Sequence, residues 1–317
     1  MVTTISTKDK DAQSRGEENM VHATDAPSVG TMHNAYATAS VTSRNGTIIT
    51  YRQFGHGPGL VILHGSMSTG ANHVQLAELL ADTFTVYVPD RRGFGLSGPC
   101  RMEDQIEQDV DDLEALLTET STHNVFGVSA GSIIGLKAAL SLSSIHKLAV
   151  YEPPLFTNRA VPTAMVARFD QEMAQGKVAA ALTTTMKGAP LMSDLFSAMP
   201  RWLVGFMTNR MMAFEAKRGP SDYASFRELA PTLHHDGQII ITMSGQQASL
   251  RAIHADVLLL GGSKSTKFLK AGLDSVAAVL PQARRVEFAG LNHGSTWNSD
   301  LRGKPEVVAQ ELRQFFA

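Results

Sequence analysis

The chain has 317 residues, of which 43% are hydrophobic and 18% are charged, the balance of a globular protein large enough to bury a substantial core. Its formal net charge is only −2, so no strongly basic surface points to nucleic-acid binding. A single cysteine, Cys100, excludes an internal disulfide and a cysteine-rich metal site.

The first 34 residues are polar and lack hydrophobic periodicity, so residues 1–34 are predicted to form a disordered tail. Their sequence has no hydrophobic segment of the signal-peptide type. No apolar run in the chain approaches the roughly 20 residues that a membrane helix needs. We therefore expect a cytoplasmic protein with no membrane partner, and the sequence leaves its oligomeric state open.

After the tail, two strand-like runs flank Asn45-Gly46, which is a strong signal for a β-hairpin. Strand-like and helix-like segments then alternate along the chain. The strands expected after the hairpin are 59–65, 84–90, 124–130, 146–154, 256–262 and 284–290. The expected helices are 72–82, 103–120, 131–143, 267–280 and 305–316. In helix 103–120 the apolar residues recur at helical spacing, and its acidic residues are predicted to face solvent.

This alternation breaks between the strand 146–154 and the strand 256–262, where helix-like segments are separated by Pro and Gly. The fold class predicted is α/β, a mainly parallel sheet covered by helices on both faces. Residues 35–153 and 237–317 would form this core. Residues 154–236 would form an inserted helical cap above the carboxyl ends of the strands, where such sheets bind ligands.

The pentapeptide GVSAG, residues 127–131, lies between a predicted strand and a predicted helix. A sharp turn there would lift Ser129 above the edge of the sheet, and the two small flanking glycines let the chain bend. Ser129 is therefore the predicted nucleophile. An oxyanion would be held by the backbone N–H of Ala130 and by a second N–H, from Ser66 or Met67, in the loop after the strand 59–65.

His293 follows the last predicted strand, within the sequence GLNHG. A base at that position would meet Ser129 above the sheet, in the chain order nucleophile, acid, histidine. His64, in the sequence HGS, is instead interpreted as a residue that shapes the oxyanion loop.

Together the HGS loop, PDRRGFGLSGP, GVSAG and GLNHG resemble the α/β-hydrolase superfamily. The resemblance covers about residues 36–317, and it is closest to the cap-bearing group of esterases, lactonases, dehalogenases and carbon–carbon bond hydrolases. It implies a serine nucleophile at Ser129, a histidine base at His293 and an oxyanion hole near Ser66 and Ala130. A serine in place of an aspartate at position 129 disfavours dehalogenase and epoxide hydrolase chemistry.

Many members of this superfamily carry the acid after the strand that corresponds to 256–262, but the loop 263–267 here reads SKSTK and has no acid. Other cap-bearing members place it at the end of the strand after the nucleophile helix. Glu152 occupies that position in this chain. Its predicted role is to accept the Nδ1–H of His293 and to stabilise the imidazolium. The alternative is a structural carboxylate at the first turn of the cap.

Two other motifs are interpreted as structural. GFGLSG, residues 93–98, matches a dinucleotide-binding pattern, but Pro99 and Cys100 follow where a phosphate-binding helix should begin. The cluster His234-His235-Asp236 lacks a spaced third ligand and is predicted to be a solvated junction between cap and core. No metal or cofactor is expected.

The cap is rich in methionine, with eight of the fourteen in the chain. Adaptable thioethers suit varied apolar ligands, so an apolar substrate is predicted. The residues expected to bind it are Trp202, Phe206 and Met207.

The sequence thus predicts a cofactor-free serine hydrolase that cleaves a carboxylic ester or lactone of a small, largely apolar molecule. Three alternatives stay open: a carbon–carbon bond hydrolase or lyase on the same triad, a cofactor-free oxygenase-type enzyme, and a non-catalytic binder.

Overall fold

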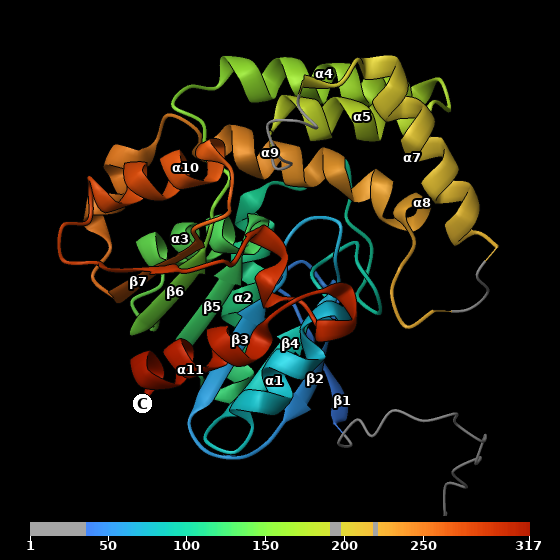
Figure 1. Ribbon diagram of the computed structural model, residues 1–317. Helices are drawn as coiled ribbons and strands as arrows, with labels where there is room; N and C mark the ends of the chain where they lie inside the picture. Colours follow the sequence, from blue (N-terminus) through green and yellow to red (C-terminus); the bar gives the residue numbers. More distant parts are fainter. Residues whose placement is uncertain (1–35, 191–197, 218–220) are drawn as a thin grey trace, which may run out of the picture. The chain divides into compact units, whose positions relative to one another are not determined.

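The computed structural model describes residues 36–190, 198–217 and 221–317, so the tail expected at 1–34 lies outside the described residues. Within these ranges one eight-stranded sheet has the strand order β1-β2-β4-β3-β5-β6-β7-β8 (Figure 1). The strands are β1 (Ala37–Thr42), β2 (Ile48–Phe54), β3 (Gly59–Leu63), β4 (Thr85–Pro89), β5 (Asn124–Val128), β6 (Lys147–Tyr151), β7 (Asp256–Gly262) and β8 (Arg284–Phe288).

The hairpin expected at Asn45-Gly46 joins β1 to β2, and Gly46 adopts the positive φ of 85° that its turn requires. β1 pairs with β2 and β2 with β4 in antiparallel fashion. The pairs from β3–β4 through β7–β8 are all parallel. The predicted fold class is thereby confirmed, and the carboxyl ends of the parallel strands meet at one edge of the sheet.

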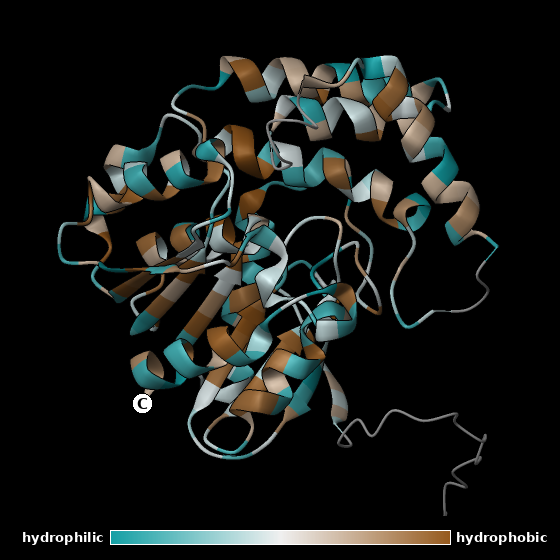
Figure 2. Ribbon diagram, viewed as in Figure 1, coloured by the Kyte–Doolittle hydropathy of each residue, from teal (hydrophilic) through white to brown (hydrophobic). Residues whose placement is uncertain are grey.

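Helices cover both faces of the sheet. One face carries α1 (Val74–Leu80) and α11 (Pro305–Phe316), and the other carries α2 (Ile106–Thr120), α3 (Ala130–Ser141) and α10 (Lys267–Ala277). Each pair of layers encloses a cluster of buried aliphatic and aromatic side chains, and the strands between them are largely apolar (Figure 2). These two cores fix the position of the loops at the carboxyl edge.

The chain between β6 and β7 forms helices and no strand among its described residues. They are α4 (Ala160–Ala174), α5 (Val178–Gly188), α7 (Arg201–Glu215), α8 (Phe226–Leu229) and α9 (Leu233–Met243). Figure 1 shows α4 and α5 above α9, on the far side of it from the sheet. The predicted cap boundary at residue 236 falls inside α9, because Ile239, Ile240 and Met243 at its end join the core cluster against α3.

Short 3₁₀ helices complete the structure: η1 (Gly70–His73), η2 (Ala230–Thr232), η3 (Gln247–Ala252), η4 (His293–Thr296) and η5 (Ser299–Leu301). Within the described ranges, none of the helices combines the length and the apolar character needed to cross a bilayer.

Candidate active site

Ser129 stands at the sharp turn between β5 and α3. Its backbone has φ 53° and ψ −117°, a conformation that non-glycine residues rarely adopt. The turn is tight on both sides, because a Cβ on Gly127 would lie 2.4 Å from the Gly131 carbonyl oxygen and one on Gly131 would lie 2.4 Å from that of Leu63. Such strain is maintained at sites where a side chain must be presented to a ligand.

Glu152 and His293 come together although they lie 141 residues apart. Nδ1 of His293 and Oε2 of Glu152 are 2.8 Å apart. The other carboxylate oxygen, Oε1, accepts the backbone N–H of Gly262 at 2.7 Å. Glu152 is 1% exposed, and its φ of 51° departs from regular strand geometry directly after β6. Both carboxylate oxygens therefore have a donor, and the glutamate side chain is held in one orientation.

The backbone joins this pair to the serine turn. The N–H of Ser129 donates to the carbonyl of Tyr151, the residue before Glu152, at 2.9 Å. The Tyr151 hydroxyl donates to the carbonyl of Asn292, the residue before His293, at 2.8 Å. In the sequence, Tyr151 carries no signal other than its position next to Glu152, since its hydrogen bond to Asn292 spans 141 residues.

The loop after β3 lies against the nucleophile. A Cβ on Gly65 would come within 2.8 Å of the Ser129 Cβ, so the loop backbone packs directly on the serine. Met67 in the same loop has a φ of 53°. Ala130 is the first residue of α3, and its N–H is one that the helix itself cannot use. Gly65 and Ala130 therefore adjoin Ser129 from two different elements, and Ser66 and Met67 follow Gly65 in the same loop.

His64 is fully buried and shapes this loop. Its Nε2 accepts the backbone N–H of Arg91 at 3.0 Å, and its Nδ1 lies 2.9 Å from the Gly65 carbonyl, to which it donates. Burial, together with the nearby Arg91 charge, lowers the pKa of His64 well below its ordinary value. The imidazole is thus neutral and cannot exchange with solvent, as expected for a structural histidine.

An apolar cluster reaches the site from the helices between β6 and β7. Met67 packs with Ala179 and Leu182 of α5, Met212 of α7 and Ala230 of η2. Further methionines and Phe226 surround this cluster. These side chains are the apolar surface next to the oxyanion loop.

The three residues predicted to bind substrate lie elsewhere. Trp202, Phe206 and Met207 are exposed, at 74%, 59% and 45%. None of them belongs to the cluster around Met67. Residue types alone could not tell which of the two apolar faces of α7 would turn toward the site.

The glycine-rich loop 93–98 wraps a carboxylate. Oδ2 of Asp90 accepts the N–H of Leu96 at 3.0 Å, and a Cβ on Gly95 would lie 2.2 Å from the same oxygen. Oδ1 accepts from Gly70 N–H and from Arg52. The loop amides therefore bind the protein's own aspartate, which leaves no cradle for a phosphate.

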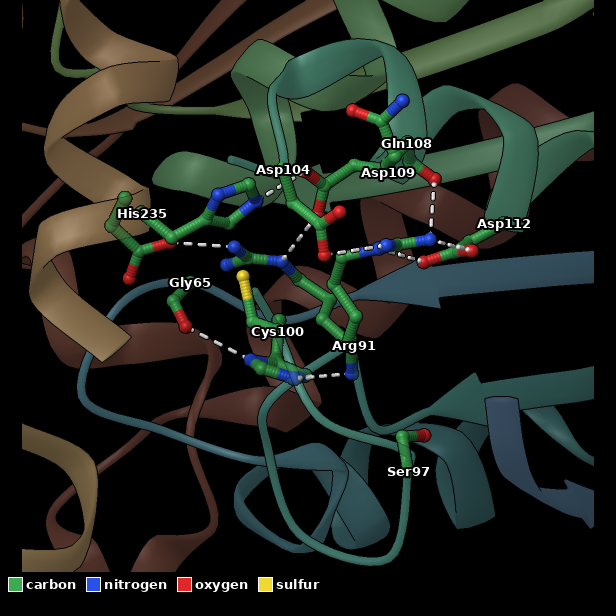
Figure 3. A network of polar contacts seen from close by, with 12 residues as sticks. Gly65, Arg91, Ser97, Cys100, Asp104, Gln108, Asp109, Asp112 and His235 are labelled. Carbon is green, nitrogen blue, oxygen red and sulfur yellow. Dashed lines mark hydrogen bonds and ion pairs between the residues drawn. The ribbon is translucent and has the colours of Figure 1, made fainter. Parts of the chain in front are cut away.

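A buried ionic network joins α9 to the loop after β4 and to α2 (Figure 3). Nη2 of Arg91 lies 2.5 Å from Oδ1 of Asp236, and Nε2 of His235 lies 2.6 Å from Oδ2 of Asp109. All four side chains are buried. The prediction that His235 and Asp236 are solvated was wrong, because Arg91 and Asp109, distant in sequence, neutralise them in the interior.

The same network corrects the orientation expected for α2. Asp109 and Asp112 are buried, and Arg92 binds both oxygens of Asp112, at 2.6 and 2.7 Å, and Asp104 at 2.8 Å. An apolar stripe predicts the core face of a helix correctly. It does not predict that buried arginines will draw carboxylates inward on a second face.

This network makes stability depend on pH. Burial alone lowers the pKa of His235, but the Asp109 carboxylate outweighs it and raises that pKa to about 10. Because the folded pKa lies above the ordinary value of about 6.5, the stabilisation is complete below pH ~6.5 and is lost as the pH rises through about 10. We expect the free energy of unfolding to fall by on the order of 5 kcal/mol over this range.

Denaturant unfolding of the wild type and of His235→Gln across that pH range measures the effect. The variant should be less stable at pH 7 and should show a flatter pH dependence. His234→Gln is the matched control, since His234 pairs with Asp170 at the surface of the helical segment. Parallel pH profiles for wild type and His235→Gln would contradict the assignment.

No group of three or more metal-ligating side chains occurs in the part of the chain that the structure describes. The groups gathered at the carboxyl edge are instead a strained serine, a histidine paired with a buried carboxylate, and backbone amides on two sides. This is the set of groups used in nucleophilic acyl transfer.

Comparison with known proteins supports the same conclusion. The alpha/beta hydrolase family model matches residues 60–311. Pimeloyl-[acyl-carrier protein] methyl ester esterase of Xanthomonas oryzae pv. oryzae (strain MAFF 311018) is 24% identical over 270 residues, which cover 83% of this chain and 96% of that protein.

Two solved structures share the fold. An alpha/beta hydrolase from Sphaerobacter thermophilus DSM 20745 is 29% identical with a TM-score of 0.71, and the match covers 88% of this chain and 100% of that one. The enol-lactonase from Burkholderia xenovorans LB400 is 16% identical with a TM-score of 0.63, covering 88% and 99%. Since the family model spans most of the sequence, the chain belongs to the alpha/beta hydrolase family and is an enzyme of that family.

Proposed function

We propose that this enzyme hydrolyses a carboxylic ester or lactone of a small, largely apolar substrate, with Ser129, His293 and Glu152 as its catalytic triad. The observation that carries the proposal is the 2.8 Å contact between His293 Nδ1 and Glu152 Oε2 at the sheet edge that also bears the strained Ser129. The similarity to a methyl ester esterase supports an ester over a carbon–carbon bond.

In the first half-reaction the Ser129 hydroxyl attacks the carbonyl carbon while Nε2 of His293 takes its proton. Glu152 accepts the Nδ1–H throughout, so the imidazole keeps the tautomer that leaves Nε2 free to act as a base. The N–H groups of Ala130 and of Ser66 or Met67 stabilise the tetrahedral oxyanion. His293 then gives the proton to the leaving alcohol, and an acyl-enzyme remains on Ser129.

In the second half-reaction His293 removes a proton from water, and the resulting hydroxide attacks the acyl carbon. Collapse of the intermediate releases the carboxylic acid and returns the proton to Ser129. A lactone opens by the same steps into one hydroxy acid. Residues 154–236 act as the cap, and their apolar cluster at Met67 receives the acyl or aryl part of the substrate.

Product analysis tests this proposal directly. Purified enzyme is offered aryl esters, alkyl esters, lactones and β-diketones of matched size, with dissolved oxygen recorded in parallel. We expect carboxylic acid to form from an ester or lactone, with no oxygen consumption. Cleavage confined to the diketones would contradict ester hydrolysis in favour of a carbon–carbon bond hydrolase, and oxygen consumption would favour an oxygenase-type reaction.

A further inference from the structure

The helix α7 exposes a continuous apolar face. Five of the eleven exposed large hydrophobic side chains in the described residues lie on this one helix. The spacing of four and then eight residues places three of them on one row of the helix: Trp202, Phe206 and Phe214. Their side chains are 74%, 59% and 58% exposed. Isolated exposed apolar residues are normal on a protein surface, but a row of this kind marks an interaction surface.

The opposite face of α7 is buried. A second row, two residues along from the first, is made up of Val204, Thr208 and Met212. Two residues correspond to a rotation of about 200°, so this row lies on the opposite side of the helix. That row packs toward α5, and Met212 joins the cluster that contains Met67 of the oxyanion loop. One helix therefore has its inner face beside the catalytic groups and its apolar outer face in solvent.

Cations lie within the outer face. Arg210 continues the row between Phe206 and Phe214, and Lys217 is exposed just beyond the end of the helix. Neither has a carboxylate partner among residues 36–190, 198–217 and 221–317. The one acid of α7, Glu215, accepts the backbone N–H of Phe226 at 3.0 Å. The exposed face thus combines large apolar side chains with positive charge that has no carboxylate partner within the described ranges.

We propose that the outer face of α7 docks on an anionic lipid surface, so that the enzyme takes its apolar substrate from that surface. A helix with Trp and Phe on one face and Arg and Lys beside them lies in the interface, with its cations at the headgroup phosphates. A contact between α7 helices of two copies fits this face less well, because the one acid of the helix, Glu215, already accepts the Phe226 N–H and is not free for Arg210. That the substrate comes from the lipid surface rests on the proposed function, whereas the docking of α7 on that surface does not.

Docking of α7 on a lipid surface departs from the expectation of no membrane partner. A helix that lies in the interface spans nothing, so a search for apolar runs of membrane length cannot find it. An interfacial helix is instead recognised by the apolar residues that it exposes, and these can be identified only when the buried row of the helix is known.

Vesicle binding tests the docking surface. The Trp297→Phe variant leaves Trp202 as the only tryptophan of the chain, because the sequence contains two. Vesicles of equal parts phosphatidylcholine and phosphatidylglycerol are compared with vesicles of phosphatidylcholine alone, at low and at high salt. We expect the emission of Trp202 to shift to shorter wavelength, and the protein to sediment with the anionic vesicles, more strongly at low salt.

Surface variants then locate the contact. Phe206→Asp should weaken binding at least about tenfold, and Arg210→Gln about fivefold. Met102→Asp and Arg251→Gln are the matched controls, since they change an exposed methionine and an exposed arginine outside α7. Equal binding by Phe206→Asp and wild type would overturn the proposal.

Two other results would also overturn it. One is binding of the wild type to neither vesicle. The other is the formation of dimers without lipid that Phe206→Asp converts to monomers, which would make the face a contact between copies. Hydrolysis of a short water-soluble ester is measured on the same samples as a separate readout of the catalytic site. Vesicle binding without hydrolysis would refute the proposed function and leave the docking surface intact.

Discussion

Replacing Ser129 by alanine is expected to lower kcat for ester hydrolysis on the order of a millionfold, to the level supported by binding and the oxyanion amides alone. The reason is that, in the proposed mechanism, the Ser129 Oγ forms the acyl-enzyme, and alanine has no atom in its place. Alanine removes one oxygen and still fits the turn at the end of β5, where the flanking glycines make room for the backbone. Steady-state kinetics on the best ester found in the substrate panel measure the effect.

Ser132→Ala is the control for this variant. Ser132 is also buried at the start of α3, but its hydroxyl donates to the Gly127 carbonyl at 2.7 Å and so holds the turn from within. Loss of the Ser132 hydroxyl should therefore lower the melting temperature but leave kcat nearly unchanged. A Ser129→Ala enzyme that keeps more than a small fraction of wild-type kcat would mean that another group attacks the carbonyl.

Glu152→Gln is expected to lower kcat about ten-thousandfold, with a much smaller change in KM. In the wild type each oxygen of the Glu152 carboxylate has one N–H donor: His293 donates to Oε2 and Gly262 donates to Oε1. A glutamine has one oxygen for these two donors. If that oxygen stays on Gly262, the amide N–H faces Nδ1 and forces the wrong imidazole tautomer. If the amide is flipped, its NH₂ group faces the backbone N–H of Gly262, and two buried donors are left without an acceptor there.

Glu152→Asp separates charge from reach. Aspartate keeps both acceptors on a side chain one methylene shorter, so the pair with His293 should be stretched and kcat should fall less than in Glu152→Gln. Melting temperatures of all three proteins show whether folding is preserved. If Gln and Asp at this position have equal and small effects on kcat, Glu152 is a structural carboxylate and the acid must be sought elsewhere.

The order of strands and helices could be predicted because each signal is local. The Asn45-Gly46 hairpin, the alternation of buried strands with amphipathic helices and the turn at Ser129 all depend on residues close together in the sequence. The structure confirms the sheet that they predict. The boundary at residue 236 was less predictable, because α9 continues from the helical segment into the core without a break in its hydrogen bonding.

The buried charges could not be predicted, because burial of a carboxylate depends on partners far along the chain. Asp109 meets His235 across 126 residues, and Asp236 meets Arg91 across 145. Nothing in the local pattern of α2 distinguishes Asp109 from its exposed acidic neighbours. The exposure of Trp202 is a similar case, since it depends on which row of α7 packs against α5.

The loop that lacks an acid, 263–267, has a different role in the structure. The Lys264 N–H donates to the carbonyl of Leu291 at 2.8 Å, and the Ser263 hydroxyl accepts the N–H of Gly290, also at 2.8 Å. These bonds hold the segment that leads to His293. The loop therefore supports the histidine segment through the Lys264 backbone and the Ser263 side chain, while the carboxylate partner, Glu152, directly follows the neighbouring strand β6.

Labelling by a fluorophosphonate tests the central claim most directly, because it requires an activated serine but no knowledge of the substrate. Wild type and Glu152→Gln are exposed to the reagent, labelling is followed with time, and the adduct is located by mass spectrometry. Rapid labelling of the wild type on Ser129, with the variant slower by a factor on the order of a thousand or more, is the predicted result. A folded wild type that does not label, or that labels on another residue, would contradict the assignment of Ser129 as the nucleophile.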